Sequence, residues 1–421
     1  MFSRVRCLLL AITILLSALA PAAYAHIIEL QGQQLPGLVG QPVGSYGFFA
    51  VKDGQLQPVA HQWVPWSLED TPWFGSDDEL RAAGKAGTIE PLTRLLLRFE
   101  DGGNRYVKNP ADTVQPMAEI MVYYNQQQHF FYVVKNPYLH NTKSYVTFDP
   151  VKMQIKTTHY ALNMDPKNML IWKDFYYKGY QSPDGSRQSI LDTMKLRLSA
   201  GVLAGRITLT NDNLEPHIKE VINGPLAVLA YADTSLKVAG IKVLSIHNYF
   251  VIKPNQTDIY ARFTLPGPAK LVLQSPAVSI SLDGNALYGS RLSTSWTGSD
   301  TAITDSRVSV TEKRMIGMSM PRNGWIYFDT GNQFSLLAQL QFSDNLNVPV
   351  SLVYEDNAAQ ENKPERYLGQ QPNVGFSMKD LPFGQQFAFM VRLIYSNDSS
   401  DDSQAYARNL LSPPQVQYHE L

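Results

Sequence analysis

The sequence predicts an all-β protein: an antiparallel β-sandwich, in its larger form a supersandwich, with a small N-terminal β domain. Two observations support this class. Most apolar residues recur with a period of two, as in the segment FSLLAQLQF at 334–342. Asp-Gly and Asn-Gly dipeptides, which tolerate the positive φ of tight hairpin turns, interrupt these runs at short spacing. They are Asp53-Gly54, Asp101-Gly102, Asp184-Gly185, Asn223-Gly224, Asp283-Gly284 and Asn323-Gly324.

The first 25 residues predict an export signal. Arg4 and Arg6 precede an apolar run from Leu8 to Leu19, and the small residues at 23–25 predict cleavage before His26. The apolar run is shorter than the ~20 residues that span a bilayer, and no later stretch offers such a length without charges. We therefore expect a soluble periplasmic or secreted protein with no integral membrane segment after cleavage.

Charge and cysteine content exclude several classes of function. The chain has 36 basic and 37 acidic residues, and removal of Arg4 and Arg6 leaves 34 against 37. No basic stripe is visible, so we expect no nucleic-acid partner. The single cysteine, Cys7, lies in the signal, so the mature chain has no disulfide and no thiolate metal site. We expect no cofactor.

An N-terminal β-rich domain is predicted over residues 26–149, because Asn136-Pro137 and Asp149-Pro150 are candidate boundaries. Residues 119–124 and 129–134 read as two strands around a polar loop. The sequence Ser76-Asp77-Asp78-Glu79 matches a capping box and predicts a short helix.

A large β-sandwich is predicted over residues 150–421, a size that single all-β domains reach. The first candidate strand, 145–148, comes just before Asp149-Pro150. The others are 153–160, 196–200, 207–210, 226–231, 236–243, 248–252, 259–263 and 308–311.

The chain resembles uncharacterised secreted bacterial proteins in which a small β domain precedes a galactose-mutarotase-like β-supersandwich. The resemblance rests on QPVAHQ at 57–62, DEL at 78–80, IKEVINGPL at 218–226 and LSPPQV at 411–416. It implies carbohydrate by association with relatives that include sugar epimerases and polysaccharide lyases. No catalytic residue of those enzymes can be matched to this sequence.

Two aromatic clusters are candidate ligand sites. Aromatic faces stack on the apolar faces of sugar rings, while nearby acids and bases bind hydroxyls. The alternative is that alternate aromatics point into the core. Trp63, Trp66 and Trp73 form the second cluster, to which the same alternative applies. The denser cluster supplies the candidate binding residues Trp172, Asp174, Tyr176, Tyr177 and Tyr180.

Metal binding is predicted at no position, although two patterns were weighed. An N-terminal His26 could chelate copper through its amine and imidazole, but it also leads directly into a plausible strand. Residues 211–215, NDNLE, offer oxygen ligands for calcium, but Asn and Asp also cap turns.

The leading functional expectation is an exported, non-catalytic protein that binds glycan or envelope components through an aromatic surface. The alternative is a lyase or epimerase that abstracts a proton with a histidine, tyrosine or carboxylate base. The sequence does not specify the catalytic residues or the oligomeric state. Candidate acids and bases are Asp174, His159, Glu215, His217 and His247.

Overall fold

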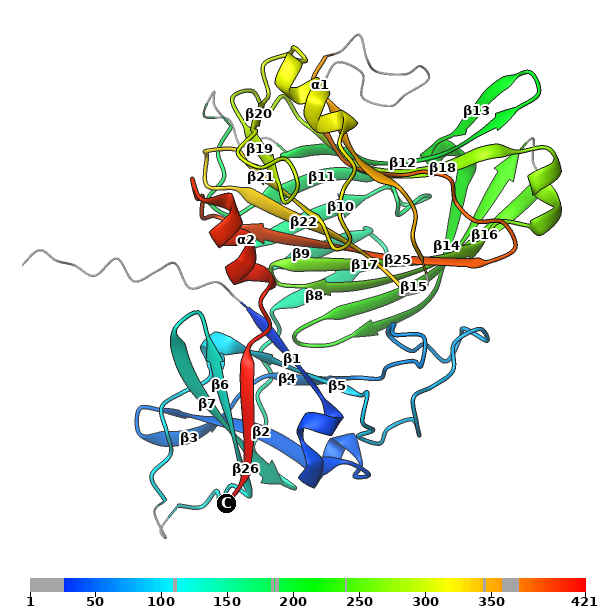
Figure 1. The fold of residues 1–421 in the computed structure, drawn as a ribbon. Helices are drawn as coiled ribbons and strands as arrows, with labels where there is room; N and C mark the ends of the chain where they lie inside the picture. The colour runs from blue at the N-terminus through cyan, green and yellow to red at the C-terminus, as the bar shows by residue number, and fades with distance from the viewer. Residues whose placement is uncertain are drawn as a thin grey trace, which may run out of the picture.

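The protein is built from antiparallel strands arranged in five sheets (Figure 1). The computed structural model describes residues 26–108, 112–182, 185, 189–238, 241–343, 346–357 and 371–421. Within these ranges there are only two short α-helices, α1 (Val310–Gly317) and α2 (Ser403–Leu411). The predicted all-β class, an antiparallel sandwich, is confirmed. No helix in the described part of the chain is long and apolar enough to cross a membrane.

Two facing sheets form the N-terminal unit. Their alternating apolar side chains meet in one core, which includes Leu30, Leu97, Ile120 and Phe131. The strands of the three-stranded sheet, in the order β1-β5-β4, are β1 (Ile27–Gln31), β5 (Arg94–Arg98) and β4 (His61–Val64). The five-stranded sheet runs β26 (Gln415–Glu420), β6 (Ala118–Tyr124), β7 (Gln127–Lys135), β2 (Tyr46–Lys52) and β3 (Gln55–Pro58).

Tight turns connect these strands where the sequence allows positive φ. Asp53 and Gly54, with φ of 51° and 76°, join β2 to β3 as the dipeptide predicts. Asn125 and Gln126, with φ of 47° and 62°, join β6 to β7. The predicted pair of strands around the 125–128 loop is therefore confirmed.

A nine-stranded sheet forms one layer of the large sandwich (Figure 1). Residues on one face of its strands, such as Ile259 and Val391, enter the main core. Its order is β14 (Leu214–Asn223), β15 (Val228–Val238), β16 (Ile241–Lys253), β17 (Gln256–Thr264), β25 (Gln386–Ser396), β22 (Ser335–Phe342), β21 (Trp325–Asp329), β19 (Arg291–Thr294) and β20 (Ala302–Ile303).

Two smaller sheets contribute the rest of the same core. A small apolar cavity of about 50 Å³ between the layers belongs to this core. The five-stranded sheet runs β13 (Gly205–Leu209), β12 (Leu191–Val202), β18 (Gln274–Gly284), β24 (Asn373–Met378) and β23 (Val350–Glu355). The four-stranded sheet runs β11 (Trp172–Tyr177), β10 (Tyr160–Met164), β9 (Gln154–Thr157) and β8 (Val146–Asp149).

The last strand of the chain lies in the N-terminal unit. β26 pairs with β6, and the chain ends at the bottom of Figure 1. Residues 415–420, which belong to the predicted domain 150–421, form the edge strand of the first unit's sheet. The exact position of the boundary stays a prediction.

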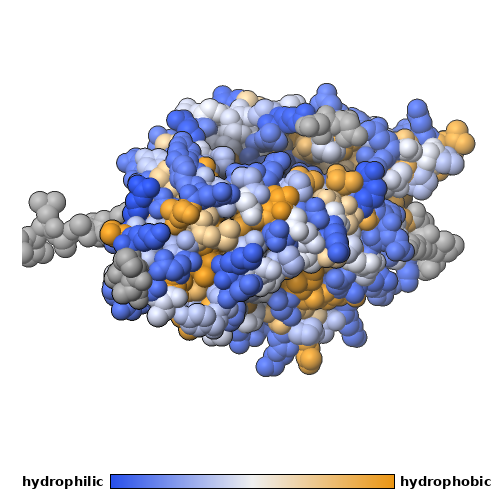
Figure 2. Space-filling model, turned by 90° about the horizontal axis from the view of Figure 1, so that it is seen from below, coloured by the Kyte–Doolittle hydropathy of each residue, from blue (hydrophilic) through white to orange (hydrophobic). Residues whose placement is uncertain are grey.

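The N-terminal unit packs on the outer face of the nine-stranded sheet. Alternate residues of β16 and β17, including Tyr249 and Tyr260, leave the main core and contact Val64, Phe74 and Leu96. In the view from the N-terminal side, hydrophobic patches are interspersed among hydrophilic side chains (Figure 2). This interface positions the polar groups described next.

Several local predictions were wrong. Residues 76–79 form turns instead of a helix, and residues 310–317, part of which was expected as a strand, form α1. Ser309 and Glu312 make the capping box there, with Glu312 N donating to Ser309 Oγ at 3.2 Å. The expected strand 153–160 is divided between β9 and β10. Residues 228–231 and 236–238 belong to the longer strand β15 and residues 241–243 to β16, while residues 239–240 lie outside the described residues. Residue 184 of the Asp184-Gly185 turn lies outside the described residues.

Candidate functional site

Three tryptophans meet at one pocket on the N-terminal unit. Trp63 belongs to β4, and Trp66 and Trp73 belong to the loop that follows it. The pocket has a volume of about 120 Å³. The other lining residues come from the strand-free segment 82–93, with Val43 and Pro65. Aromatic walls with a few polar groups are the usual composition of small-molecule sites.

The loop from Pro65 to Trp73 folds back on itself and brings two indoles together. Trp66 and Pro72 form an antiparallel bridge, and Trp73 N donates to Pro65 O at 3.0 Å. Ser67 Oγ donates to Thr71 O at 3.0 Å inside the bend. These short-range bonds hold the two ring systems on the same side of the loop.

The indole of Trp66 is fixed on both its edge and its face. Its Nε1 donates to Asp70 Oδ1 at 2.9 Å, and the guanidinium carbon of Arg94 lies 3.4 Å from the ring centroid. Arg94 Nη2 also donates to Asp70, at 3.1 Å. Trp63 packs edge-on against Phe48, and its buried Nε1 has no hydrogen-bond partner within the described residues.

Polar groups on the other side of the pocket are supplied by the 84–93 turn. Glu90 Oε1 accepts a hydrogen bond from Lys85 N at 3.0 Å, and Glu90 N donates to Thr93 Oγ1 at 3.0 Å. Gly84 lies so close that an added Cβ would come within 2.3 Å of the Glu90 side chain. The lining therefore combines three tryptophans with the polar residues Lys85, Glu90 and Thr93.

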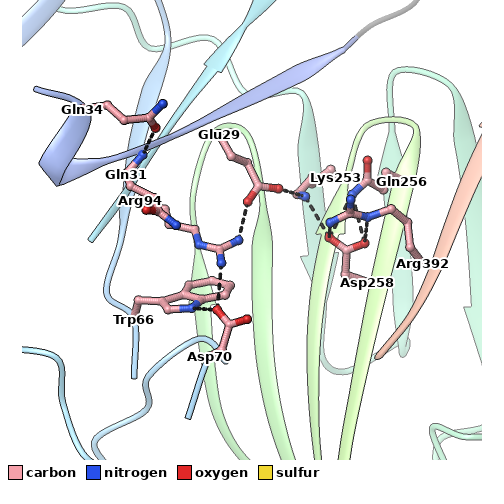
Figure 3. A network of polar contacts seen from close by, with 10 residues as sticks. All are labelled: Glu29, Gln31, Gln34, Trp66, Asp70, Arg94, Lys253, Gln256, Asp258 and Arg392. Atoms are coloured by element: carbon pink, nitrogen blue, oxygen red, sulfur yellow. Dashed lines mark hydrogen bonds and ion pairs between the residues drawn. The ribbon is translucent and has the colours of Figure 1, made fainter. Parts of the chain in front are cut away.

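A buried ion network lies next to the pocket, between the N-terminal unit and the large sheet (Figure 3). Glu29 of β1 is paired with Arg94 at 2.9 Å and with Lys253 of β16. Lys253 also contacts Asp258 of β17 at 2.9 Å, and Asp258 accepts from Arg392 Nε at 2.8 Å. Three cations and three carboxylates, with Asp70 as the third, balance one another.

The cations of this network hold its carboxylates in the charged form. Burial alone would raise the pKa of Asp258, but Arg392 and Lys253 outweigh it and lower that pKa below its ordinary value. The same balance, with Lys253 as the largest favourable charge, lowers the pKa of Glu29. Glu29 and Asp258 are therefore ionised at neutral pH.

An open groove borders the network. Its volume is about 180 Å³, and it lies between the loop 69–71 and the strands β17, β22 and β25. Arg94, Arg262 and Arg392 all line it, together with Tyr260 and Met390. Since Trp66 lines the tryptophan pocket and Arg94 lies on its ring, the Trp66–Arg94 stack is the wall between pocket and groove.

A second polar cluster surrounds His247, one of the candidate acids and bases from the sequence, with two carboxylates. His247 Nδ1 lies 3.0 Å from the Tyr231 hydroxyl and 3.4 Å from Asp77 Oδ2, and its Nε2 lies 3.4 Å from Glu79 Oε1. The Tyr249 hydroxyl donates to Asp77 Oδ2 at 2.5 Å. These side chains bring a base, two acids and two phenols together.

In this cluster the pKa of His247 is raised and the pKa of Asp77 is lowered. The hydrogen bond to Asp77, with the charges of Glu79 and Asp77, raises the pKa of His247 in spite of burial. Burial would raise the pKa of Asp77, but its bonds with His247 and Tyr249 lower it overall. The pair therefore favours a charged histidine beside a charged carboxylate.

The densest predicted aromatic cluster is not a surface. Trp172, Tyr177 and Tyr180 are 3%, 5% and 4% exposed and belong to the main core. Trp172 and Tyr177 lie on the buried face of β11, and Tyr180, just after the strand, packs edge-on against Phe334. The prediction of a binding surface there is wrong for these three residues. Tyr176 and Asp174 are partly exposed, and Asp174 accepts a hydrogen bond from Asn163 at 3.1 Å.

The other sequence candidates are dispersed. His217 is exposed, His159 is partly buried, and Glu215 pairs with Lys237. Asn211–Asn213 forms a short 3₁₀-helix in which Asn211 donates to Leu170 O and Met194 O, so these side chains cap backbone. The ring of His26 stacks on Tyr124 at 4.2 Å. Across the described ranges, no three His, Cys, Asp or Glu side chains are placed to hold a metal ion.

Some residues of the two polar clusters stand in sequence patterns that could have indicated their role. Asp77 was interpreted as part of a helix cap because the capping-box pattern is local, whereas its partners are 170 residues away. Lys253, Asp258, Arg262 and Arg392 are charges within otherwise apolar strands, and that pattern predicts buried pairs.

Comparisons with known proteins describe the fold only distantly. Neither a protein-family model nor a curated protein matches the sequence. An alpha-mannosidase from Enterococcus faecalis has a TM-score of 0.47 at 10% identity over 94% of this chain and 44% of its own. An alpha-N-acetylgalactosaminidase from Bifidobacterium bifidum has a TM-score of 0.33 at 12% identity, over 60% of this chain and 38% of its own. The Slr1438 protein from Synechocystis has a TM-score of 0.35 at 7% identity, over 62% of this chain and 100% of its own.

The chain thus spans less than half the length of the two glycosidases. At TM-scores below 0.5, these similarities carry no argument about chemistry, and the functional reasoning rests on the residues above.

Proposed function

We propose that this is an exported protein that binds glycan, without turning it over, through the pocket of Trp63, Trp66 and Trp73. The observation that carries the proposal is the convergence of three indoles on one cavity that also holds Glu90 and Lys85. Periplasmic or extracellular placement, predicted by the first 25 residues, is part of the proposal, and an envelope glycan is the expected ligand.

The chemistry of the pocket fits one sugar ring. An indole face offers flat apolar area to the C–H face of a sugar, and a carboxylate with an ammonium can accept from and donate to its hydroxyls. Trp66 is held in place by Asp70 and Arg94, so little side-chain freedom is lost when a ligand binds.

Retention on an array of bacterial and algal glycans tests this proposal, with the chain starting at His26 and product analysis by mass spectrometry in the same wells. Trp73→Ala removes one partly exposed wall of the pocket. We expect about tenfold weaker retention, which corresponds to about 1.4 kcal/mol.

Tyr123→Ala is the matched control, because it removes an exposed aromatic residue outside the pocket. It should bind like the wild type. Undiminished retention by the Trp73 variant, with both proteins folded by circular dichroism, would rule out the pocket as the binding site.

The cluster around His247 favours a second candidate function, an acid–base enzyme of the lyase or epimerase kind. A histidine whose pKa is raised by a buried carboxylate is a candidate proton donor, and Tyr231 lies within hydrogen-bond distance of it. No described pocket is lined by His247, so binding remains the leading proposal.

Turnover of the arrayed glycans separates the two functions. If the enzyme hypothesis is right, His247→Gln should remove product formation, whereas His159→Gln and His217→Gln should keep it. Equal melting temperatures of the three variants would exclude unfolding as the cause. Retention with no product from the wild type would reject the enzyme and support the binding protein.

A further inference from the structure

Arg262 is the least compensated buried cation among the described residues of the interface. Its side chain is only 5% exposed. It donates one hydrogen bond, from Nη1 to the neutral hydroxyl of Tyr249 at 3.3 Å. The nearest carboxylate, Glu79, lies 4.0 Å away and is itself 57% exposed. A buried guanidinium with so little direct compensation is costly unless another anion approaches it.

The neighbouring carboxylates are already in use. Asp258 accepts from Lys253, Gln256 and Arg392, and Glu29 pairs with Lys253 and Arg94. On the opposite wall, Asp70 pairs with Arg94 and Glu69 pairs with Arg81 at 2.7 Å.

The acids beyond Tyr249 are shared with a second cation. Asp77 and Glu79 both contact His247. Arg262 therefore lines the groove with one distant carboxylate partner, Glu79, which it shares with His247.

The groove is placed to receive part of the same ligand as the tryptophan pocket. Trp66 of the pocket stacks on Arg94 of the groove, and Asp70, which binds both residues, lines the groove. The floor of the groove is formed by Tyr260 and Met390 of neighbouring strands, whose residues are paired in register.

We infer that the ligand is a carboxylate-bearing glycan, with a uronic acid unit in the groove at Arg262 and an adjacent unit at the tryptophan pocket. This inference rests on the proposed glycan binding and specifies its ligand class. The planar guanidinium matches the two oxygens of a carboxylate, and the ligand would supply an anion to a guanidinium whose nearest protein carboxylate lies 4.0 Å away.

The test compares tetragalacturonate with its carboxyl-reduced form, in which an uncharged hydroxymethyl group replaces each carboxylate. Binding is measured by titration calorimetry with the mature chain. We expect the wild type to bind tetragalacturonate at least tenfold more tightly than the reduced form. Arg262→Gln should remove most of that difference, and Arg262→Lys should keep part of it.

Arg307→Gln, at an exposed arginine, is the matched control and should leave both affinities unchanged. Melting temperatures report whether the Arg262 variants are folded, and Arg262→Lys keeps the test valid if the glutamine variant is not. Equal binding of the two tetramers by the wild type would overturn the inference and leave the proposed function standing. A wild type that retains no glycan at all would overturn both.

Discussion

At the scale of single residues, the structure depends on charges that are removed from water in matched sets. Lys253 and Asp258 are each 1% exposed and 2.9 Å apart, and Glu29 closes the set from the other unit. Removing one member of such a set leaves its partners as uncompensated buried charges. The network therefore fixes where the N-terminal unit lies on the sheet more than it adds to net stability.

Replacing Lys253 with methionine is expected to cost roughly 3–5 kcal/mol of unfolding free energy, because Glu29 and Asp258 stay buried without their shared cation. Urea denaturation measures this. The same substitution at Lys152, which is 72% exposed and 3.6 Å from Asp149, should cost less than about 1 kcal/mol. Similar losses at both positions would contradict the role given to the network.

The pH dependence of stability follows from the same residues. The pKa values of Glu29 and Asp258 are lowered on folding, so their contribution is complete above the unfolded value of about 4. It is lost as the pH falls through the lower folded values. Lys253→Met should make this loss shallower, since Lys253 is one of the charges that lower both pKa values.

At the scale of elements, the alternation of apolar residues predicted those strands and hairpins that form between residues close in the sequence. The hairpin of β6 and β7 was placed within two residues, because period-two alternation and a polar turn are both local. The same pattern could not say which face of β11 is buried. Trp172 and Tyr177 share a face with core residues, whereas Trp63 and Trp73 are partly exposed, and only the packing of distant strands decides this.

The candidate site shows the same limit. The cluster of Trp63, Trp66 and Trp73 was visible as aromatic residues between prolines. The partners that give the neighbouring groove its chemistry, such as Arg262, come from a strand about 190 residues later. Sequence spacing identifies residues of one loop together but cannot bring a loop and a distant sheet face into contact.

At the scale of the whole molecule, the two units are joined at both ends of the chain. The N-terminal strand β1 carries Glu29 into the ion network, and the C-terminal strand β26 pairs with β6 across its full length. Val416 and Tyr418 of β26 cover the core of the N-terminal unit from one edge. Because of these links, we expect the wild-type chain to melt in one calorimetric transition.

Removal of residues 415–421 should separate the two units thermally. The loss exposes the edge of β6 and uncovers apolar side chains under Val416 and Tyr418, so we expect roughly 2 kcal/mol or more of destabilisation of the N-terminal unit. Calorimetry should then show an early transition for that unit, followed by the sandwich. Gln417→Ala changes a side chain on the exposed face of β26 and should shift stability by no more than about 0.5 kcal/mol. A truncated chain that melts in one step at the wild-type temperature would mean that the interface with the large sheet, and not β26, holds the N-terminal unit together.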